Sequence, residues 1–431
     1  MFEVLFVLLL LLILLALGVP VAYSLIISST TGLFAIIGVS RSMGILLNEP
    51  YATAGSYLYA TIPMFVLMAL FLQKCGLITH VFQAMYKWTS RLPGGLAITT
   101  TFANGGMAAL TGSSTASAAT MASIAIPEMR KYDYDDRLSF GTVAAAGTFA
   151  IMFPPSLGLI LYGILTETSI ADLFIAGIIP GILTLLSYVL LILYWSKRDP
   201  TVTGLGTDEQ LPIFTWGEKF QSLLPIYPAL LLILLVLGGL YGGVVTPSEA
   251  GALGASGAFL IAVIFYRIGF DHLREAIVET IEITVMIFMI IIGAMIFARF
   301  LALSGVTSAM ITFVGDIPVN RWIIFLLIIL FYIALGTIMS QTAILVLTIP
   351  VTFPLVVDGL GFHAIWFGIV LVKTAEIGMV TPPLGLNIYV AASAIEVELE
   401  QAFRGAARFV IADIIVLLLL LLFPGIVFLL L

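Results

Sequence analysis

Cysteine and charge are both scarce in this sequence. Its 431 residues include one cysteine, Cys75, and three histidines. A single cysteine excludes an intrachain disulfide, and so few Cys and His side chains give no pattern for a zinc site. Charged residues make up 10% of the chain, whereas a typical soluble domain has about 25%. The net charge of −7 is dispersed, with no basic patch suited to nucleic acid.

Apolar residues dominate the sequence instead. They make up 61% of the chain, and the mean hydropathy is +1.20. Because a membrane-spanning helix needs roughly 20 apolar residues, the chain has room for about a dozen spans. Uninterrupted spans are expected near 2–18, 20–38, 54–73, 171–196, 221–241, 247–266, 281–302 and 408–429, with amphipathic pieces at 74–91 and 267–280 and a loop at 303–321. The sequence therefore predicts an all-α polytopic membrane protein with a single integral membrane domain over residues 1–431.

Four further apolar segments are interrupted. Segments 95–127 and 322–357 contain polar runs of small residues near Gly112 and Gly336. Since irregular backbone at membrane depth must lie inside protein or line a cavity, these two segments predict re-entrant helical hairpins. Segments 138–166 and 363–395 contain Pro-Pro pairs, which remove backbone donors and end a helix. They predict two proline-broken helices.

These features occur twice in the same order, which indicates an internal repeat. Counting the predicted crossings gives opposite orientations to the first repeat, 50–196, and the second, 280–429. Residues 197–279 would supply connecting spans and a cytoplasmic amphipathic segment, and most Lys and Arg residues would then lie on one side, as the positive-inside rule expects. Inverted repeats with broken helices in corresponding positions are typical of secondary transporters, whose site lies near the midplane.

Hydroxyl groups gather at the four interruptions. They belong to Ser113, Ser114, Ser117, Ser156, Thr337, Ser340, Thr374 and Thr381. Half-helix N-termini attract an anion, whereas half-helix C-termini and unwound carbonyls bind a cation. The alternative is that small residues only permit close helix packing. We favour that alternative for Ala116, Ala118 and Ala119, and a functional role for the Gly-Ser-Ser turn that begins at Gly112.

Two charged residues in apolar segments each have two interpretations. Glu376 is either functional, the default for an intramembrane carboxylate, or the ion-pair partner of Lys373. Arg299 either attracts a substrate carboxylate or extends to the membrane interface, and we favour the second. No clustered His, Asp or Cys residues indicate an intramembrane enzyme, and paired inverted hairpins favour alternating access over a channel.

The motifs, taken in order, resemble the large membrane subunit of tripartite ATP-independent periplasmic (TRAP) transporters. The matching stretches are 111–119, 126–129, 153–156, 176–181, 246–250 and 376–385. The resemblance implies an elevator-type symporter in the bacterial inner membrane that imports a small organic anion, a carboxylate or sulfonate. It implies no cofactor beyond Na⁺ as coupling ion. The implied partners are a small four-helix membrane subunit and a soluble periplasmic binding protein. A related elevator symporter that works without a binding protein remains the alternative.

The resemblance also implies two sodium sites with the substrate between them. The first sodium would lie near Asn104, Gly105, Ser113 and the segment from Gly147 to Pro154, and the second near Gly336, Thr337, Thr374, Gly378 and Met379. The substrate would contact Ser114, Ser156 and Ser340. Ser340 stands where many relatives of the family carry an aspartate. This difference removes a negative charge near the proposed substrate site, so the resemblance does not indicate which organic anion is the substrate.

Overall fold

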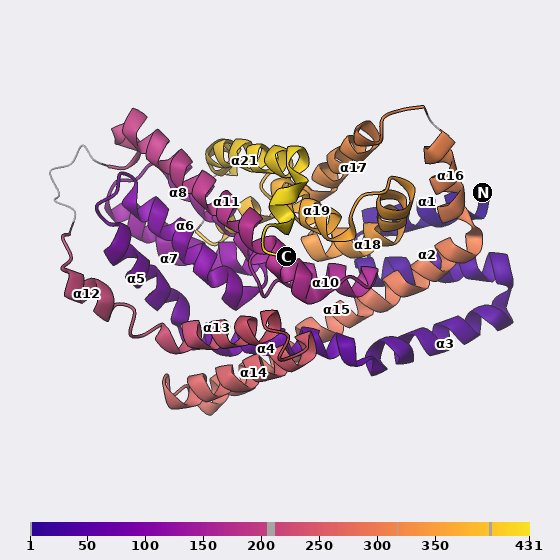
Figure 1. Cartoon of the computed structure of the whole chain (residues 1–431), viewed down its shortest axis with the longest axis horizontal. Coiled ribbons are helices and arrows are strands. Elements are labelled where there is room, and N and C mark those ends of the chain that lie inside the picture. The colour runs from indigo at the N-terminus through magenta and orange to yellow at the C-terminus, as the bar shows by residue number, and fades with distance from the viewer. Residues whose placement is uncertain (1, 205–211, 317, 396–398) are drawn as a thin grey trace.

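The structure is a computed structural model that describes residues 2–204, 212–316, 318–395 and 399–431, excepting the side chains of 109–111. Within these ranges the elements are helices, with no strand beyond one isolated bridge between Tyr134 and Thr203. The predicted all-α class is therefore confirmed. The helices divide into two groups, an elongated layer with its flanking helices and a set that contains the four interrupted segments (Figure 1).

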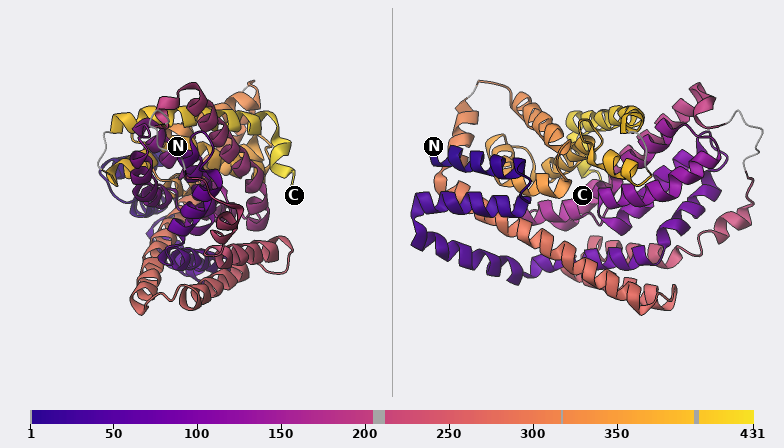
Figure 2. Two further views of the ribbon diagram at one scale, coloured as in Figure 1. Left: turned by 90° about the vertical axis from the view of Figure 1, so that its left-hand side faces the viewer. Right: turned by 180° about the vertical axis from the view of Figure 1, so that it is seen from behind.

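The first group forms an elongated layer. Helices α4, α13, α14 and α15 run along one side, and α1, α2 and α3 stack at one end (Figures 1 and 2). The layer packs closely because small residues face neighbouring helices, and a hydrogen bond of 2.8 Å joins Thr61 Oγ1 of α4 to Ser248 Oγ of α14. The helices are α1 (Phe2–Ala16), α2 (Val21–Ile37), α3 (Val39–Gly55), α4 (Thr61–Lys74), α5 (Leu77–Thr89), α12 (Trp216–Gln221), α13 (Tyr227–Tyr241), α14 (Pro247–Ile264), α15 (Phe270–Ser304) and α16 (Val306–Asp316).

The second group contains the four interrupted segments. Two helical hairpins, α6–α7 and α17–α18, are each followed by a broken helix, α8–α9–α10 or α19–α20, and then by a long helix, α11 or α21. The helices are α6 (Gly95–Thr111), α7 (Ser114–Lys131), α8 (Asp136–Ala146), α9 (Phe149–Met152), α10 (Leu157–Thr166), α11 (Ile170–Arg198), α17 (Arg321–Gly336), α18 (Gln341–Phe353), α19 (Ala364–Met379), α20 (Leu386–Ser393) and α21 (Leu399–Leu422). A π turn over Pro354–Gly359 extends α18.

Local sequence explains where these helices stop and start. Gly112 ends α6 in the left-handed region, at φ 58°, a conformation that glycine adopts without a steric penalty. Ser113 and Ser156 then cap α7 and α10, since each side chain accepts a backbone N–H three residues on. The two Pro-Pro bonds, Pro154-Pro155 and Pro382-Pro383, are both cis and lie inside the two breaks.

Two expectations about the connecting segments are wrong. Residues 303–321 were expected to form a loop, but 306–316 form α16, which begins directly after Gly305 turns the chain at φ 70°. Residues 267–280 were expected to be a separate amphipathic piece, but they join the following span in the 35-residue helix α15. No glycine or proline interrupts residues 270–292, so the helical hydrogen bonds continue through the polar first turns.

The surface has the character of a protein in contact with lipid. Among the described residues, seven helices are long and apolar enough to cross a membrane. Large apolar side chains project outward from α13 and α15, including Leu231, Leu234, Ile281 and Val285. Such faces are stable in hydrocarbon because the helix satisfies its own backbone groups.

Candidate functional site

The first hairpin tip contacts the second broken helix. Ser114 Oγ donates a hydrogen bond of 3.3 Å to Asn387 Oδ1 and lies 3.6 Å from Met379 Sδ. Asn387 Nδ2 in turn donates to the Ala144 carbonyl at 3.4 Å. Asn387 therefore joins the first tip to α8 and to the start of α20.

The second tip contacts both breaks. The Thr337 carbonyl accepts a hydrogen bond of 3.2 Å from the Gly385 backbone. Gly336 and Gly378 meet so closely that a Cβ on Gly378 would lie 2.5 Å from the Gly336 Cα atom, a spacing that only glycine permits. The side chain of Gln341 packs directly against Gly158 in the first broken helix. All four interruptions therefore come together in one region.

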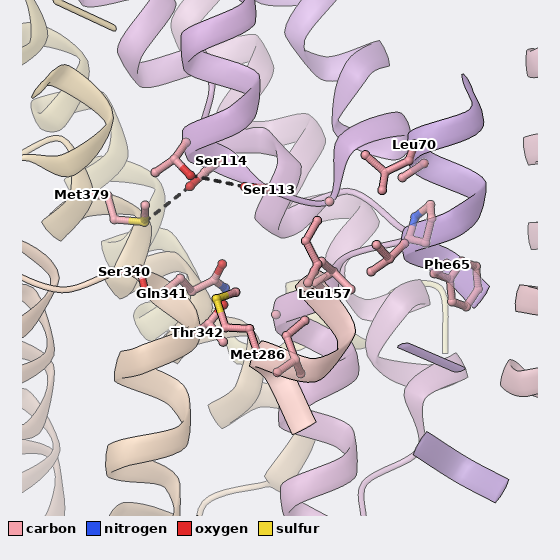
Figure 3. Close-up of a pocket in the computed structure, with 18 residues that line it drawn as sticks. Phe65, Leu70, Ser113, Ser114, Leu157, Met286, Ser340, Gln341, Thr342 and Met379 are labelled. Carbon is pink, nitrogen blue, oxygen red and sulfur yellow. Dashed lines mark hydrogen bonds between the residues drawn. The ribbon is translucent and has the colours of Figure 1, made fainter. Parts of the chain in front are cut away.

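A cavity of about 180 Å³ lies at this meeting point (Figure 3). Its polar groups come from the two hairpin tips, and its apolar wall comes from α4, α10 and α15. The lining residues are Phe65, Val66, Ala69, Leu70, Gly112, Ser113, Ser114, Thr115, Pro155, Leu157, Gly158, Ile283, Met286, Ile287, Ser340, Gln341, Thr342 and Met379. None of these residues is charged.

Three helices begin at the cavity. Their first residues, Ser114 of α7, Leu157 of α10 and Gln341 of α18, all line it. The first N–H groups of a helix lack intrahelical partners and carry roughly half a positive charge in total. The cavity can therefore attract an anion through backbone groups, without a lysine or arginine.

Two of the three predicted substrate residues line the cavity. Ser114 and Ser340 both do so, and the Ser340 hydroxyl makes no capping hydrogen bond to α18. Ser156 does not line the cavity. Its Oγ donates to the Ile151 carbonyl and accepts from the Leu159 backbone at 3.3 Å, so it fixes the start of α10 instead of facing the cavity.

The residues predicted for the first sodium site gather around the first hairpin. Asn104 is fully buried on α6, and its Oδ1 accepts a hydrogen bond of 3.1 Å from Ser117 Oγ. Its Nδ2 has no partner among the described residues. Gly147 packs against Ala118 of α7, where a Cβ at position 147 would lie 2.8 Å from the alanine Cβ.

The other three members of this set are placed differently. Ser113 lines the cavity, with its Oγ 3.3 Å from Thr115 Oγ1. Pro154 is buried inside the break and does not line the cavity. A Cβ on Gly105 would meet Leu185 of α11 at 2.9 Å, so Gly105 lies at a helix contact.

The residues predicted for the second sodium site lie around the close contact of Gly336 with Gly378. Thr337 and Thr374 each donate their hydroxyl to a carbonyl of the preceding turn, at 2.8 and 2.7 Å. Their hydroxyl oxygens keep lone pairs that can accept a further ligand. Met379 ends α19 and lines the cavity.

Glu376 forms an ion pair with Lys373, which was the second of the two interpretations drawn from the sequence. Lys373 Nζ lies 2.9 Å from Glu376 Oε2 and 2.6 Å from Asp413 Oδ1. Tyr188 donates a hydrogen bond of 2.6 Å to Asp413 Oδ2. The buried charged cluster of Lys373, Glu376, Asp413 and Tyr188 joins α19, α21 and α11, and none of its members lines the cavity.

Arg299 also lies outside the cavity. Its side chain is 62% exposed, and its Nε lies 3.7 Å from Glu49 Oε2. Sequence reasoning missed Asn387 and Asp413, and did not assign Gln341 a role. A lone amide or acid in an apolar segment, especially next to an interruption, is the signal that could have found them.

Comparison with known proteins identifies the family of this chain. The family model described as "Tripartite ATP-independent periplasmic transporter, DctM component" matches residues 8–426. The chain belongs to this TRAP transporter family. The DctM-family protein described here is thus a multi-pass inner-membrane transporter subunit and not an enzyme, as the sequence predicted.

Several relatives of this TRAP subunit span nearly its whole length. It is 32% identical to the C4-dicarboxylate TRAP transporter large permease protein DctM of Pseudomonas aeruginosa, covering 90% of this chain and 92% of that protein. It is 27% identical to the sialic acid TRAP transporter large permease protein SiaM of Vibrio cholerae, covering 94% and 93%. The isethionate TRAP transporter permease protein DctMQ of Oleidesulfovibrio alaskensis is 29% identical, over 90% of this chain and 60% of that longer protein.

A solved structure supports the fold. The YdaH transporter of Alcanivorax borkumensis superimposes with a TM-score of 0.65 over 91% of this chain and 90% of that one. Its sequence is only 14% identical, so the likeness concerns the arrangement of helices alone.

Proposed function

We propose that this TRAP subunit imports a small organic anion, a carboxylate or sulfonate, coupled to sodium and by an elevator mechanism. A periplasmic binding protein would deliver the anion, and a small four-helix membrane subunit would brace the complex. The observation that carries the proposal is the cavity where both hairpin tips and three helix N-termini meet without a charged side chain.

Helix N-termini support an anionic substrate. A carboxylate or sulfonate oxygen placed in the cavity can accept hydrogen bonds from the first N–H groups of α7, α10 and α18. Ser340 adds a hydroxyl donor that makes no capping bond at the same place, whereas the Ser114 hydroxyl proton is donated to Asn387. The substrates in the names of three relatives are consistent with an anionic substrate, since C4-dicarboxylates, sialic acid and isethionate are all carboxylates or sulfonates.

Oxygen-rich helix ends support sodium coupling. Helices α6, α17 and α19 end at Thr111, Gly336 and Met379, beside the cavity or its neighbouring glycine contact. Their last carbonyls carry partial negative charge, which suits a small hard cation. We propose one sodium near Asn104 and Ser113, within the first predicted set, and the other near the second predicted set, Gly336, Thr337, Thr374, Gly378 and Met379.

The wall of the cavity supports an elevator motion. The first-group helices α4 and α15 contribute only apolar side chains there, such as Phe65, Leu70 and Met286 (Figure 3). Both tips and both breaks, by contrast, are joined to one another by hydrogen bonds and glycine contacts. At the cavity, the second helix group makes its polar contacts internally and meets an apolar face of the first group. It can therefore slide along α4 and α15 without breaking hydrogen bonds. We propose that the hairpins are re-entrant and that repeats 50–196 and 280–429 are inverted in the membrane.

The test is uptake by the complete TRAP complex in liposomes. The binding protein is loaded with its own labelled ligand, and uptake is followed under an inward sodium gradient. We expect uptake to stop when potassium replaces sodium. Ser113→Ala should lower uptake several-fold, because Ser113 lines the cavity and caps α7. Ser123→Ala, at an exposed position on the same helix, is the matched control.

Two outcomes would contradict parts of this proposal. Uptake that is equal in potassium and sodium would reject sodium coupling. Full uptake of free ligand without the binding protein would favour the symporter that needs no such partner.

A further inference from the structure

The last turns of α11 and the early turns of α21 form a basic pocket, separate from the cavity between the hairpin tips. The two helices are joined nearby, since Tyr188 of α11 donates a hydrogen bond of 2.6 Å to Asp413 of α21. The pocket has a volume of about 560 Å³, and its lining residues are Leu191, Tyr194, Trp195, Arg198, Asp199 and Arg408. None of the residues proposed for sodium or substrate lines it, so the pocket has no part in the function proposed above.

Arg408 is held in place by an aromatic ring and not by an acid. Its guanidinium carbon lies 3.5 Å from the centroid of the buried Trp195 ring, and the described residues give it neither an ion pair nor a hydrogen bond. Stacking on an aromatic face orients a guanidinium while leaving the N–H groups along its edge free. Arg198 faces the same pocket, and only its Nη1 is used, in a hydrogen bond of 2.7 Å to Tyr194 Oη. Both arginines therefore have free donors for a ligand.

The charge of the pocket suits one phosphodiester. Two arginines and Asp199 leave the lining with one net positive charge. Asp199 Oδ1 accepts a hydrogen bond of 2.5 Å from Thr201 Oγ1 and pairs with neither arginine. A planar guanidinium can bind two phosphate oxygens at once. A phosphodiester carries one negative charge, so it would balance the charge of the lining.

An exposed apolar stripe runs along each helix and ends at its arginine. On α11 the side chains recur every four residues before Arg198, and on α21 they follow Arg408 every three or four. The members are Ile182, Leu186, Leu190 and Tyr194 of α11, and Ile411, Ile415, Leu418 and Leu422 of α21. At 1.5 Å per residue, each stripe is about 17 Å long, close to the ~15 Å of hydrocarbon in one leaflet. The arginines therefore lie at a membrane boundary, where Tyr and Trp side chains are also common.

We propose that this pocket binds an anionic phospholipid of the membrane. Its phosphate lies between Arg198 and Arg408, and its acyl chains follow the two apolar stripes. Basic pockets between membrane helices suit such headgroups. A free phosphate would use the arginines but leave the stripes uncovered, and a zwitterionic phospholipid would bring a cation close to the guanidinium groups. The bound lipid joins α11 to α21, the two long helices that follow the broken helices.

Lipid binding to the delipidated membrane complex tests the proposal. The whole complex is purified in detergent and titrated with phosphatidylglycerol or with phosphatidylcholine of the same acyl chains. Native mass spectrometry measures the apparent dissociation constant of the most tightly bound lipid. Glycerophosphoglycerol, which is the phosphatidylglycerol headgroup without acyl chains, is added as a competitor and separates a lipid site from a site for a soluble phosphate.

We expect a preference for the anionic lipid that depends on both arginines. A basic residue near the membrane surface changes the affinity for an anionic lipid by about fivefold, so phosphatidylglycerol should bind about 5- to 25-fold more tightly than phosphatidylcholine. The double variant Arg198→Gln, Arg408→Gln should lose this preference. Arg198→Gln alone should reduce it about fivefold, and this exposed position serves if the double variant folds poorly.

Arg404→Gln is the matched control. It removes the same charge from the same helix, but Arg404 is exposed and already pairs with Glu400 at 2.6 Å. This variant should keep the full preference for phosphatidylglycerol. Glycerophosphoglycerol should not compete in any variant, because it has no acyl chains to cover the apolar stripes.

The contrary results are distinct. Equal affinities of the wild-type complex for the two lipids would overturn the proposal, and so would a preference that persists in the double variant. An equal reduction in Arg404→Gln would show only a general surface potential. Competition by glycerophosphoglycerol would indicate a site for a soluble phosphate. Loss of the small membrane subunit from the double variant, in place of the lipid preference, would identify a protein interface instead.

Discussion

Replacing Lys373 with methionine tests the buried charged cluster. Lys373 is fully buried, and its ammonium group lies 2.9 Å from Glu376 and 2.6 Å from Asp413. Methionine keeps the length of the side chain but removes its charge. Two buried carboxylates then remain without a cation, and only Asp413 keeps a strong donor, from Tyr188.

The expected loss is large because a buried charge is left uncompensated. Removing one partner of a buried ion pair typically costs about 3–5 kcal/mol. We therefore expect Lys373→Met to lower the free energy of unfolding by about 3–5 kcal/mol. The triple variant Lys373→Met, Glu376→Gln, Asp413→Asn should lose less, because it removes the uncompensated charges together with the lysine.

The assay is unfolding in mixed micelles of increasing dodecyl sulfate content, followed by circular dichroism. Lys131→Met is the control, since the Lys131–Glu128 pair is similarly short at 2.7 Å but solvent-exposed, and it should change stability little. A loss below about 1 kcal/mol for Lys373→Met, the scale of a surface pair, would refute the reasoning. A triple variant as unstable as the single variant would show that packing, not charge, sets the loss.

Two further substitutions test contacts in the two helix groups. Gly378→Ala should cost about 1–3 kcal/mol by overpacking and slow uptake, because its Cβ would lie 2.5 Å from the Gly336 Cα atom. The control Gly238→Ala meets nothing within 4 Å, and equal thermal stability and uptake of the two variants would contradict the prediction. Ser248→Ala should cost about 0.5–1.5 kcal/mol with uptake retained, because it removes the 2.8 Å bond to Thr61 and the 3.1 Å bond to the Tyr57 carbonyl. An unchanged melting temperature relative to the exposed Ser308→Ala control would show that these bonds contribute nothing.

Several features of the fold could be predicted because their causes are local. Apolar runs of sufficient length form helices wherever they lie in the fold, and adjacent prolines end a helix whatever packs against them. The hairpin tip at Gly112 and the break at Pro154-Pro155 are found where the sequence predicts them. Segment 306–316 was predicted wrongly because a short helix of mixed polarity carries no strong periodic signal.

For the serines at the interruptions, the sequence predicts a set of candidate substrate residues but not which of them face the cavity. The sequence locates Ser114, Ser156 and Ser340 at interruptions, and the hydroxyl in each case suggests contact with a substrate. Which hydroxyl remains free depends on neighbouring backbone. Ser156 is used for capping and by the Ile151 carbonyl, whereas Ser340 faces the cavity.

The sequence alone thus determined the all-α membrane class, the duplicated order of hairpin and broken helix, and the family. Only the tertiary structure decided which distant residues meet. It brought Asn387 to Ser114 across 273 positions and Asp413 to Lys373 across 40, and it packed the Gln341 side chain against Gly158. The physical reason is that helices form through bonds four residues apart, whereas contacts between them depend on how their surfaces pack.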